Sequence, residues 1–183
     1  MTNPTPVKIV VAGGFAVGKT TFVTSLSDID PLTTEASMTR VSEGIDDVGP
    51  ATEKTATTVA MDFGRVALGD DLVLYLFGTP GQGRFRFMWD ELVRGAVGSV
   101  VLVDTSRLDD CFPVVDYMER SGIPFVVAIN TFDGILLHRP TDVAEALDLP
   151  EHIPVVVTDA RHRSAVKDSV IALVRHAMTL AQV

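Results

Sequence analysis

The sequence is poor in cysteine, and its histidines are scattered. Cys111 is the single cysteine among 183 residues, so the chain cannot form an intrachain disulfide or a thiolate metal cluster. The four histidines show no metal-ligand spacing with each other or with Cys111; they are His138, His152, His162 and His176. These absences exclude a disulfide scaffold, leave the histidines without a predicted role, and favour a reduced, cytoplasmic setting.

Basic residues are also in short supply. The chain has 15 Lys and Arg against 24 Asp and Glu, which gives a formal net charge of −9. Because surplus negative charge repels phosphate backbones and anionic lipid, we expect no nucleic acid partner and no membrane-surface binding. An anionic ligand would have to be held by local groups rather than by the overall charge.

Long apolar runs are missing as well. No run approaches the roughly 20 residues that span a bilayer. The first residues lack the pattern of a signal peptide, and the last ones lack a prenylation cysteine. We therefore expect no direct membrane anchor, so membrane contact would require recruitment by a partner. The length and the 46% hydrophobic content predict one globular domain over residues 1–183.

Four short apolar runs rich in valine and isoleucine predict strands that are buried on both faces. They lie at residues 7–12, 97–104, 124–130 and 153–159. Helix-like stretches alternate with them, and the clearest shows 3.6-residue periodicity at Val166, Val170, Leu173, Val174, Ala177 and Met178. Strands alternating with helices predict an α/β fold with a parallel sheet.

A different pattern interrupts this alternation. Residues 58–67 and 72–77 are strand-like and are separated by a turn-forming segment, residues 68–71. This spacing predicts a hairpin that adds one antiparallel edge strand to the parallel sheet. Residues 28–57 show no convincing periodicity, and loops of that length inside a domain are usually functional or disordered.

The first apolar run leads into residues 13–20, GGFAVGKT, which match the P-loop pattern GxxxxGK[ST] between a strand and a helix beginning near Thr21. Glycines let successive backbone N–H groups turn toward phosphate, and the helix N-terminus adds its dipole. Lys19 would contact the β- and γ-phosphates, and Thr20 would coordinate Mg²⁺. The predicted nucleotide-binding residues here are Gly13, Gly14, Phe15, Ala16, Val17, Gly18, Lys19, Thr20 and Thr21.

Residues 77–85, FGTPGQGRF, resemble the DxxGQ switch II segment of Ras-like GTPases. The resemblance implies that Gly81 offers its N–H to the γ-phosphate and that Gln82 is the catalytic residue that orients the attacking water. Gly78 departs from the family, in which this position is usually an aspartate of the outer metal shell. Residues 58–63, TVAMDF, resemble a Rab-type switch I strand and imply that Thr58 is a second Mg²⁺ ligand.

Residues 130–133, NTFD, resemble the guanine motif NKxD, with Thr131 in place of lysine. The Asp133 carboxylate could accept from the N1–H and the 2-amino group of guanine, whereas adenine offers no donors there. Asn130 and Asp133 could instead simply shape a turn. The resemblance also places Ala160 and Arg161 at the loop that meets the base.

These segments occur in the same order as in Ras-like small GTPases. Their sequences resemble those of the conservon GTPases of actinomycetes, which are relatives of the MglA gliding-motility switch. The resemblance implies a three-layer P-loop GTPase fold with a six-stranded, mostly parallel sheet and helices on both faces. It also implies a roadblock-type regulatory protein and a sensor-kinase-like membrane protein as partners, and an extended switch I over residues 28–57.

The predicted function is a GTP-binding and GTP-hydrolysing switch with Mg²⁺ as cofactor and GTP or GDP as ligand. The alternatives are a nucleotide-binding module with little hydrolysis, prompted by Gly78 and Thr131, and a small-molecule P-loop kinase, for which no arginine-rich lid is visible. An arginine of the same chain could stabilise the transition state of hydrolysis, and the candidates are Arg40, Arg84 and Arg86. Near switch II, an aromatic group could belong to the core or to a partner surface; it consists of Phe85, Phe87 and Trp89.

Overall fold

One sheet organises the chain in this computed structural model, which describes residues 3–30, 32–39, 56–81 and 83–182; for 32–39, 56–60 and 84 the description covers the backbone only. Within these ranges the sheet has seven strands in the order β2-β3-β4-β1-β5-β6-β7. The strands are β1 (Thr5–Gly13), β2 (Leu32–Thr39), β3 (Ala56–Leu68), β4 (Leu72–Gly78), β5 (Gly98–Val103), β6 (Phe125–Asn130) and β7 (Val155–Thr158).

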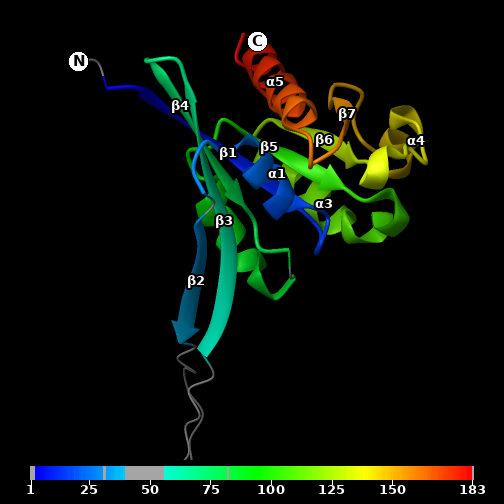
Figure 1. Cartoon of the computed structure of the whole chain (residues 1–183). Helices are drawn as coiled ribbons and strands as arrows, with labels where there is room; N and C mark the ends of the chain where they lie inside the picture. The colour runs from blue at the N-terminus through cyan, green and yellow to red at the C-terminus, as the bar shows by residue number, and fades with distance from the viewer. Residues whose placement is uncertain (1–2, 31, 40–55, 82, 183) are drawn as a thin grey trace, which may run out of the picture.

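Helices cover both faces of the sheet (Figure 1). The α-helices are α1 (Lys19–Leu26), α2 (Trp89–Val93), α3 (Phe112–Ser121), α4 (Pro140–Ala146) and α5 (Arg163–Leu180). Short 3-10 segments are η1 (Gly83–Met88), η2 (Thr105–Asp110) and η3 (Phe132–Gly134). A described helix that is long and apolar enough to cross a membrane is not found.

Two separate cores explain why the central strands are continuously apolar. Ile9 and Val11 of β1 belong to a cluster formed with α1 and α5, whereas Val10 and Ala12 belong to a cluster formed with α2, α3 and α4. All four side chains are fully buried. Burial of alternate residues against opposite helix layers stabilises β1 as the centre of the sheet.

The strand order places the site. β1 lies between β4 and β5 and is parallel to both. β4 lies on one side of β1, and the strands that follow continue on the other side, so β1 ends at a switch in strand order. In open α/β sheets, ligands bind beyond the carboxyl ends of strands at such a point. The loop after β1 is the predicted P-loop.

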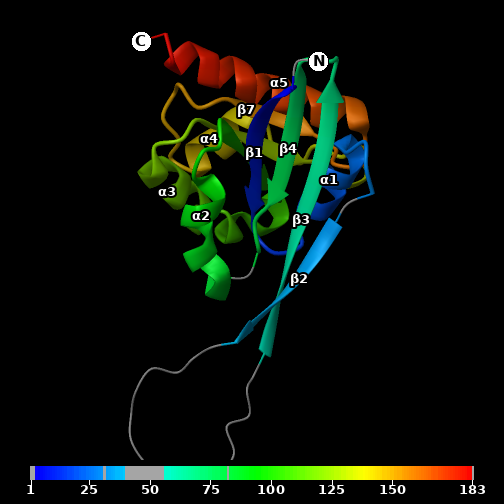
Figure 2. The same ribbon diagram turned by 90° about the vertical axis from the view of Figure 1, so that its left-hand side faces the viewer.

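The α/β architecture predicted from the sequence is confirmed, with one correction at its edge: the described sheet has seven strands rather than six. β3 is antiparallel to β4, as the hairpin pattern predicted. However, β2 pairs antiparallel with β3 on its outer side, so β3 is not the edge strand, and residues 32–39, within the stretch that showed no periodicity, form a strand. The sequence of this strand, LTTEASMT, lacks a clear apolar alternation, but its threonines suit a strand that pairs along the outer edge of β3. Figures 1 and 2 show the paired ends of β2 and β3 extending beyond the helices.

Candidate nucleotide-binding site

The P-loop connects β1 to α1 and turns sharply at Gly18. This residue has a φ of 104°, in the left-handed region, and a Cβ placed on it would lie 2.7 Å from Nδ2 of Asn130. Both the backbone conformation and the space therefore require glycine. The helix begins at Lys19, two residues earlier than the sequence predicted, because it starts directly after this turn.

Lys19 is buried, with 8% of its surface exposed, and is folded back on the loop. Its Nζ donates to the carbonyl oxygens of Gly13, at 3.0 Å, and Gly14. Burial lowers the pKa of Lys19 to about 8, and the nearby charge of Asp62 opposes that shift. Within the described part of the chain, the hydrogen bonds of this buried ammonium group go to neutral carbonyls, so the group is poised to gain from a phosphate anion.

A carboxylate from the neighbouring hairpin occupies the place expected of residue 78. The Thr20 hydroxyl donates to Oδ2 of Asp62, at 2.7 Å. A Cβ placed on Gly78 would lie 3.1 Å from both Cβ and Oδ2 of Asp62. Phe63 pairs with Phe77, which sets Asp62 opposite Gly78 across the hairpin. The Asp62 carboxylate of β3 therefore lies next to Gly78 and contacts the hydroxyl of Thr20.

A cavity of about 410 Å³ opens above these groups. Its lining includes the P-loop, Asp62 and the start of switch II; the residues are Phe15, Ala16, Val17, Gly18, Lys19, Thr20, Thr21, Asp62, Thr79, Pro80 and Gly81. A Cβ on Gly81 would lie 2.7 Å from Nζ of Lys19, so the switch II backbone closely approaches the lysine. The Thr79 hydroxyl is buried without a hydrogen-bonding partner in the described structure. We refer to this space as the phosphate cavity.

The segment η2 supports the P-loop from the other side. Arg107 donates through Nη2 to the carbonyl oxygen of Phe15, at 3.0 Å, and forms ion pairs with Asp104, at 3.3 Å, and Asp110, at 3.8 Å. The contact restrains the P-loop backbone. The sequence alone did not indicate it, because Arg107 lies far from the P-loop in the chain.

Asn130, at the end of β6, connects the P-loop to the loop after β7. Its Nδ2 donates to the carbonyl oxygen of Val17, at 2.9 Å, and its Oδ1 accepts from the backbone N–H of Ala160, at 3.0 Å. Asn130 is buried. The predicted phosphate and base segments are therefore brought together by this one amide.

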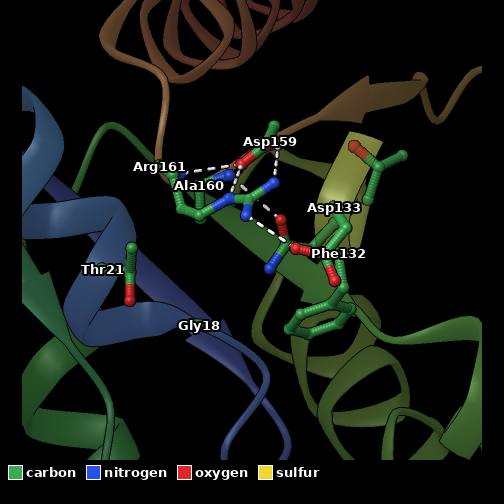
Figure 3. A pocket seen from close by; sticks show the side chains of 9 residues that line it. Gly18, Thr21, Phe132, Asp133, Asp159, Ala160 and Arg161 are labelled. Carbon is green, nitrogen blue, oxygen red and sulfur yellow. Dashed lines mark hydrogen bonds and ion pairs between the residues drawn. The ribbon is translucent and has the colours of Figure 1, made fainter. Parts of the chain in front are cut away.

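A second cavity, of about 150 Å³, lies beside Asn130 and is called the base cavity here (Figure 3). Its lining residues are Gly18, Thr21, Asn130, Thr131, Phe132, Asp133, Asp159, Ala160 and Arg161. Thr131 donates to the carbonyl oxygen of Thr158, at 3.0 Å, so it fastens the loop from inside instead of reaching outward as a lysine would. Asp133 has a φ of 58°, and its side chain is 83% exposed.

Arg161 crosses the rim of the base cavity. Its guanidinium group forms hydrogen bonds with the carboxylates of Asp159 and Asp133 (Figure 3). The hydrogen bonds from Arg161 hold the pKa of Asp159 well below its usual range. Arg161 therefore lines this cavity, and its partners are two carboxylates.

Several predicted residues lie outside what the structure describes. Gln82 and Arg40 are not among the described residues, and the side chains of Thr58 and Arg84 are not described, although Thr58 is part of β3. Arg86 lies over the ring of Trp89, 5.8 Å from its centroid.

Of the aromatic residues after switch II, two lie in the core and one is available for a partner surface. Phe85 and Trp89 are buried, whereas 58% of the surface of Phe87 is exposed. The first two belong to the interior, so an aromatic partner surface there would rest on Phe87.

Asp62 is the site residue that sequence reasoning missed. A signal was present: Asp62 is an acidic residue in a strand, and counting back across the turn from Gly78 arrives at it. Cross-strand neighbours share one face of a hairpin. The absence of an aspartate at position 78 and the presence of one at position 62, its cross-strand neighbour, could together have indicated Asp62 as a site residue.

The glycine-rich loop between β1 and α1, its buried lysine, and the polar loops at the carboxyl ends of β6 and β7 define a nucleotide-binding P-loop protein. The chain belongs to the family described as "Conserved hypothetical ATP binding protein", which matches residues 11–180.

The chain is also similar to two other proteins, one in sequence and one in fold. The chain is 32% identical over 129 residues to "Uncharacterized protein MJ1339" of Methanocaldococcus jannaschii, covering 69% of this chain and 71% of that protein. The cytosolic domain of the T. maritima FeoB iron transporter, solved in a GDP form, has a similar fold, with a TM-score of 0.67 at 16% identity. The match covers 96% of this chain but 65% of the length of that one, so the similarity concerns the fold.

Proposed function

We propose that the chain is a GTP-binding and slowly GTP-hydrolysing switch that cycles between GDP and GTP forms in bacterial signalling. The observation that carries the proposal is the junction of the two cavities, since the phosphate cavity and the base cavity share Gly18 and Thr21. One nucleotide could therefore place its phosphates at Lys19 and its base at Asp133.

The phosphate cavity suits a triphosphate with Mg²⁺. The Thr20 hydroxyl and the Asp62 carboxylate lie 2.7 Å apart, and both offer the oxygen donors that Mg²⁺ prefers. Thr20 would coordinate the metal, and the hydroxyl of Thr58 would be a further ligand. The Asp62 carboxylate would lie in the outer shell of the metal. When bound, Mg²⁺ supplies charge neutralisation between the β- and γ-phosphates.

The base cavity suits guanine. The Asp133 carboxylate would accept from the N1–H and the 2-amino group, and the Ala160 backbone N–H would lie near the base. Asn130 would position both loops through its two hydrogen bonds, to Val17 and Ala160.

Hydrolysis would depend on Gln82, which would orient the attacking water while Gly81 offers its N–H to the γ-phosphate. Without an arginine from a partner, the rate would be on the order of 10⁻⁴ to 10⁻³ s⁻¹. Gln82→Ala should lower single-turnover phosphate release and leave GDP affinity nearly unchanged, and Gln182→Ala is the matched control. Unchanged release would remove Gln82 from the mechanism. An absence of release in the parent chain as well would favour a binding module without hydrolysis.

A second candidate is an ATP-binding protein. The family description favours it, and so does the ion pair between Arg161 and Asp133, which offsets the charge that would reject adenine. Identification of the nucleotide that copurifies with the protein, followed by competition between GDP and ADP, separates the two. Bound adenine nucleotide and a preference for ADP would overturn the guanine assignment.

The signalling role rests on residues 28–57 as an extended switch I. The described ends of this region, β2 and the start of β3, extend beyond the helices, which supports a partner surface (Figure 2). A roadblock-type regulator and a sensor-kinase-like membrane protein are the proposed partners, by resemblance to the conservon GTPases, in a cytoplasmic setting. Limited proteolysis should cleave this region differently in the GDP form and in the form bound to a GTP analogue; identical cleavage would contradict the idea.

A further inference from the structure

Arg161 connects two loops that end neighbouring strands of the sheet. Its Nε and Nη2 donate to the two oxygens of Asp159, at 2.9 Å and 2.7 Å, and its Nη1 donates to Oδ1 of Asp133, at 2.9 Å. Asp159 follows β7, and Asp133 follows β6. In Figure 3 the guanidinium group lies between the two carboxylates at the base cavity.

The contact with Asp159 fixes the orientation of the guanidinium group. Asp159 is nearly buried, with 10% of its side chain exposed, and it also accepts from the backbone N–H of Arg161, at 3.0 Å. Nδ1 of His162 lies 3.2 Å from its Oδ2. A bidentate pair between arginine and carboxylate is geometrically specific because two parallel hydrogen bonds fix the plane of the group. The remaining donor, Nη1, is therefore aimed at Asp133.

Asp133 needs such a partner in order to read a base. Its side chain is 83% exposed, and Arg161 is its hydrogen-bonding partner among the described residues. A free, exposed aspartate would sample several rotamers, each with the acceptors in a different direction. Binding of Nη1 to Oδ1 restricts this motion while Oδ2 and the second lone pair of Oδ1 stay available.

We propose that Arg161 is a positioning residue that sets purine specificity by holding the Asp133 carboxylate toward the 2-amino group and N1–H of guanine. The proposal rests on the proposed function. Arg161 itself acts through Asp133 and makes no contact with the base. Its loss should therefore reduce discrimination between bases more than it reduces affinity for the phosphates.

The test compares dissociation constants of GDP, IDP and ADP for the full chain and for Arg161→Ala. IDP lacks the 2-amino group but keeps N1–H and O6, so the ratio of GDP to IDP affinity reports the contact between the carboxylate and the amino group. We expect GDP binding to weaken about tenfold, IDP binding to weaken less, and ADP binding to be unchanged.

Two other outcomes would overturn the proposal. If GDP, IDP and ADP weaken equally, Arg161 acts on the phosphates or on the overall charge. If GDP and IDP weaken equally while ADP does not, Arg161 acts on a group that both bases share, N1–H or O6, and not on the 2-amino group. A parent chain that binds ADP as tightly as GDP would instead contradict the proposed function, so the two failures are distinguishable.

Three variants separate positioning from folding. Arg161→Lys keeps the charge but has no planar fork, so it should lose the GDP preference as Arg161→Ala does. Asp159→Asn releases the anchor and should lower the same ratio. Arg139→Ala is the matched control, since Arg139 pairs with Asp142, at 2.8 Å, outside the base cavity, and should leave the ratio unchanged. Retention of the parent ratio by folded Arg161→Ala and Asp159→Asn would contradict the proposal.

Discussion

The phosphate cavity and the base cavity are built from different groups. The phosphate cavity uses a continuous loop of backbone and a lysine that is 8% exposed, whereas the base cavity uses Asp133 and Arg161, whose side chains are 83% and 49% exposed. Backbone amides and a buried cation suit strong binding of any nucleoside phosphate. An exposed carboxylate suits discrimination, because the wrong base leaves its free acceptor positions unpaired. The difference predicts that affinity and specificity are separable in this chain.

The largest expected effect tests whether affinity depends on the phosphate cavity alone. Lys19→Met removes the cation and should weaken GDP and ADP equally, by about a hundredfold, since a charge-assisted hydrogen bond network is lost. Fluorescent nucleotide displacement measures both ligands. A selective loss of GDP would show that Lys19 influences the base cavity and would end the proposed separation. Lys167→Met, on α5 and outside both cavities, is the control.

The second prediction addresses the base cavity. Asp133→Ala should lower the ratio of GDP to ADP affinity by about thirtyfold, because the acceptor for both guanine donors is lost. Competition by inorganic pyrophosphate should stay as in the parent chain. Loss of pyrophosphate binding would mean that the two cavities are coupled.

The third prediction concerns Asp62 as the replacement for the aspartate missing at Gly78. Asp62→Ala should raise about tenfold the Mg²⁺ concentration needed for half-maximal nucleotide binding, because the hydrogen bond to Thr20 is lost. Adding Gly78→Asp should return this Mg²⁺ concentration to that of the parent chain, since a side chain at position 78 would fill the space left by the deleted Asp62 side chain. If the double variant is folded but still needs the higher Mg²⁺ concentration, Asp62 does not replace an aspartate at position 78.

The smallest expected effect is a pH dependence. The pKa of Lys19 is lowered to about 8 by burial, and contact with phosphate would raise it. Nucleotide binding favours the protonated amine, so affinity should fall as pH rises, by about fourfold between pH 7 and 8.5. Calorimetric titration with ADP avoids titration of guanine itself, and a flat profile would contradict the role of Lys19.

The same group predicts an opposite trend for the stability of the free protein. The folded chain releases this proton near pH 8 and the unfolded chain near 10.5, so between these values the unfolded state binds more protons. The contribution of Lys19 to the free energy of unfolding therefore rises with pH in that window. A chemical denaturation series compared with Lys19→Met measures it.

Much of the fold follows from local pattern. The apolar runs predicted β1, β5 and β6 because strands that are buried on both faces have no polar face to display. The fourth run predicted β7 as well, but β7 is the edge strand and is only partly buried, with 41% of Val157 exposed. β2 could not be predicted, because the sequence LTTEASMT shows no clear apolar alternation and its pairing depends on a strand formed elsewhere.

Amino-acid order alone determined the P-loop, since its glycines, lysine and threonine are contiguous and the path of a short backbone segment depends on its own residues. The tertiary structure decided two other features. It set Asp62 opposite Gly78 across a hairpin, and it joined Asp133 to Arg161 at the carboxyl edge of the sheet. Both bring together residues on separate strands or loops, and their distances depend on strand register and sheet order, which no local pattern contains.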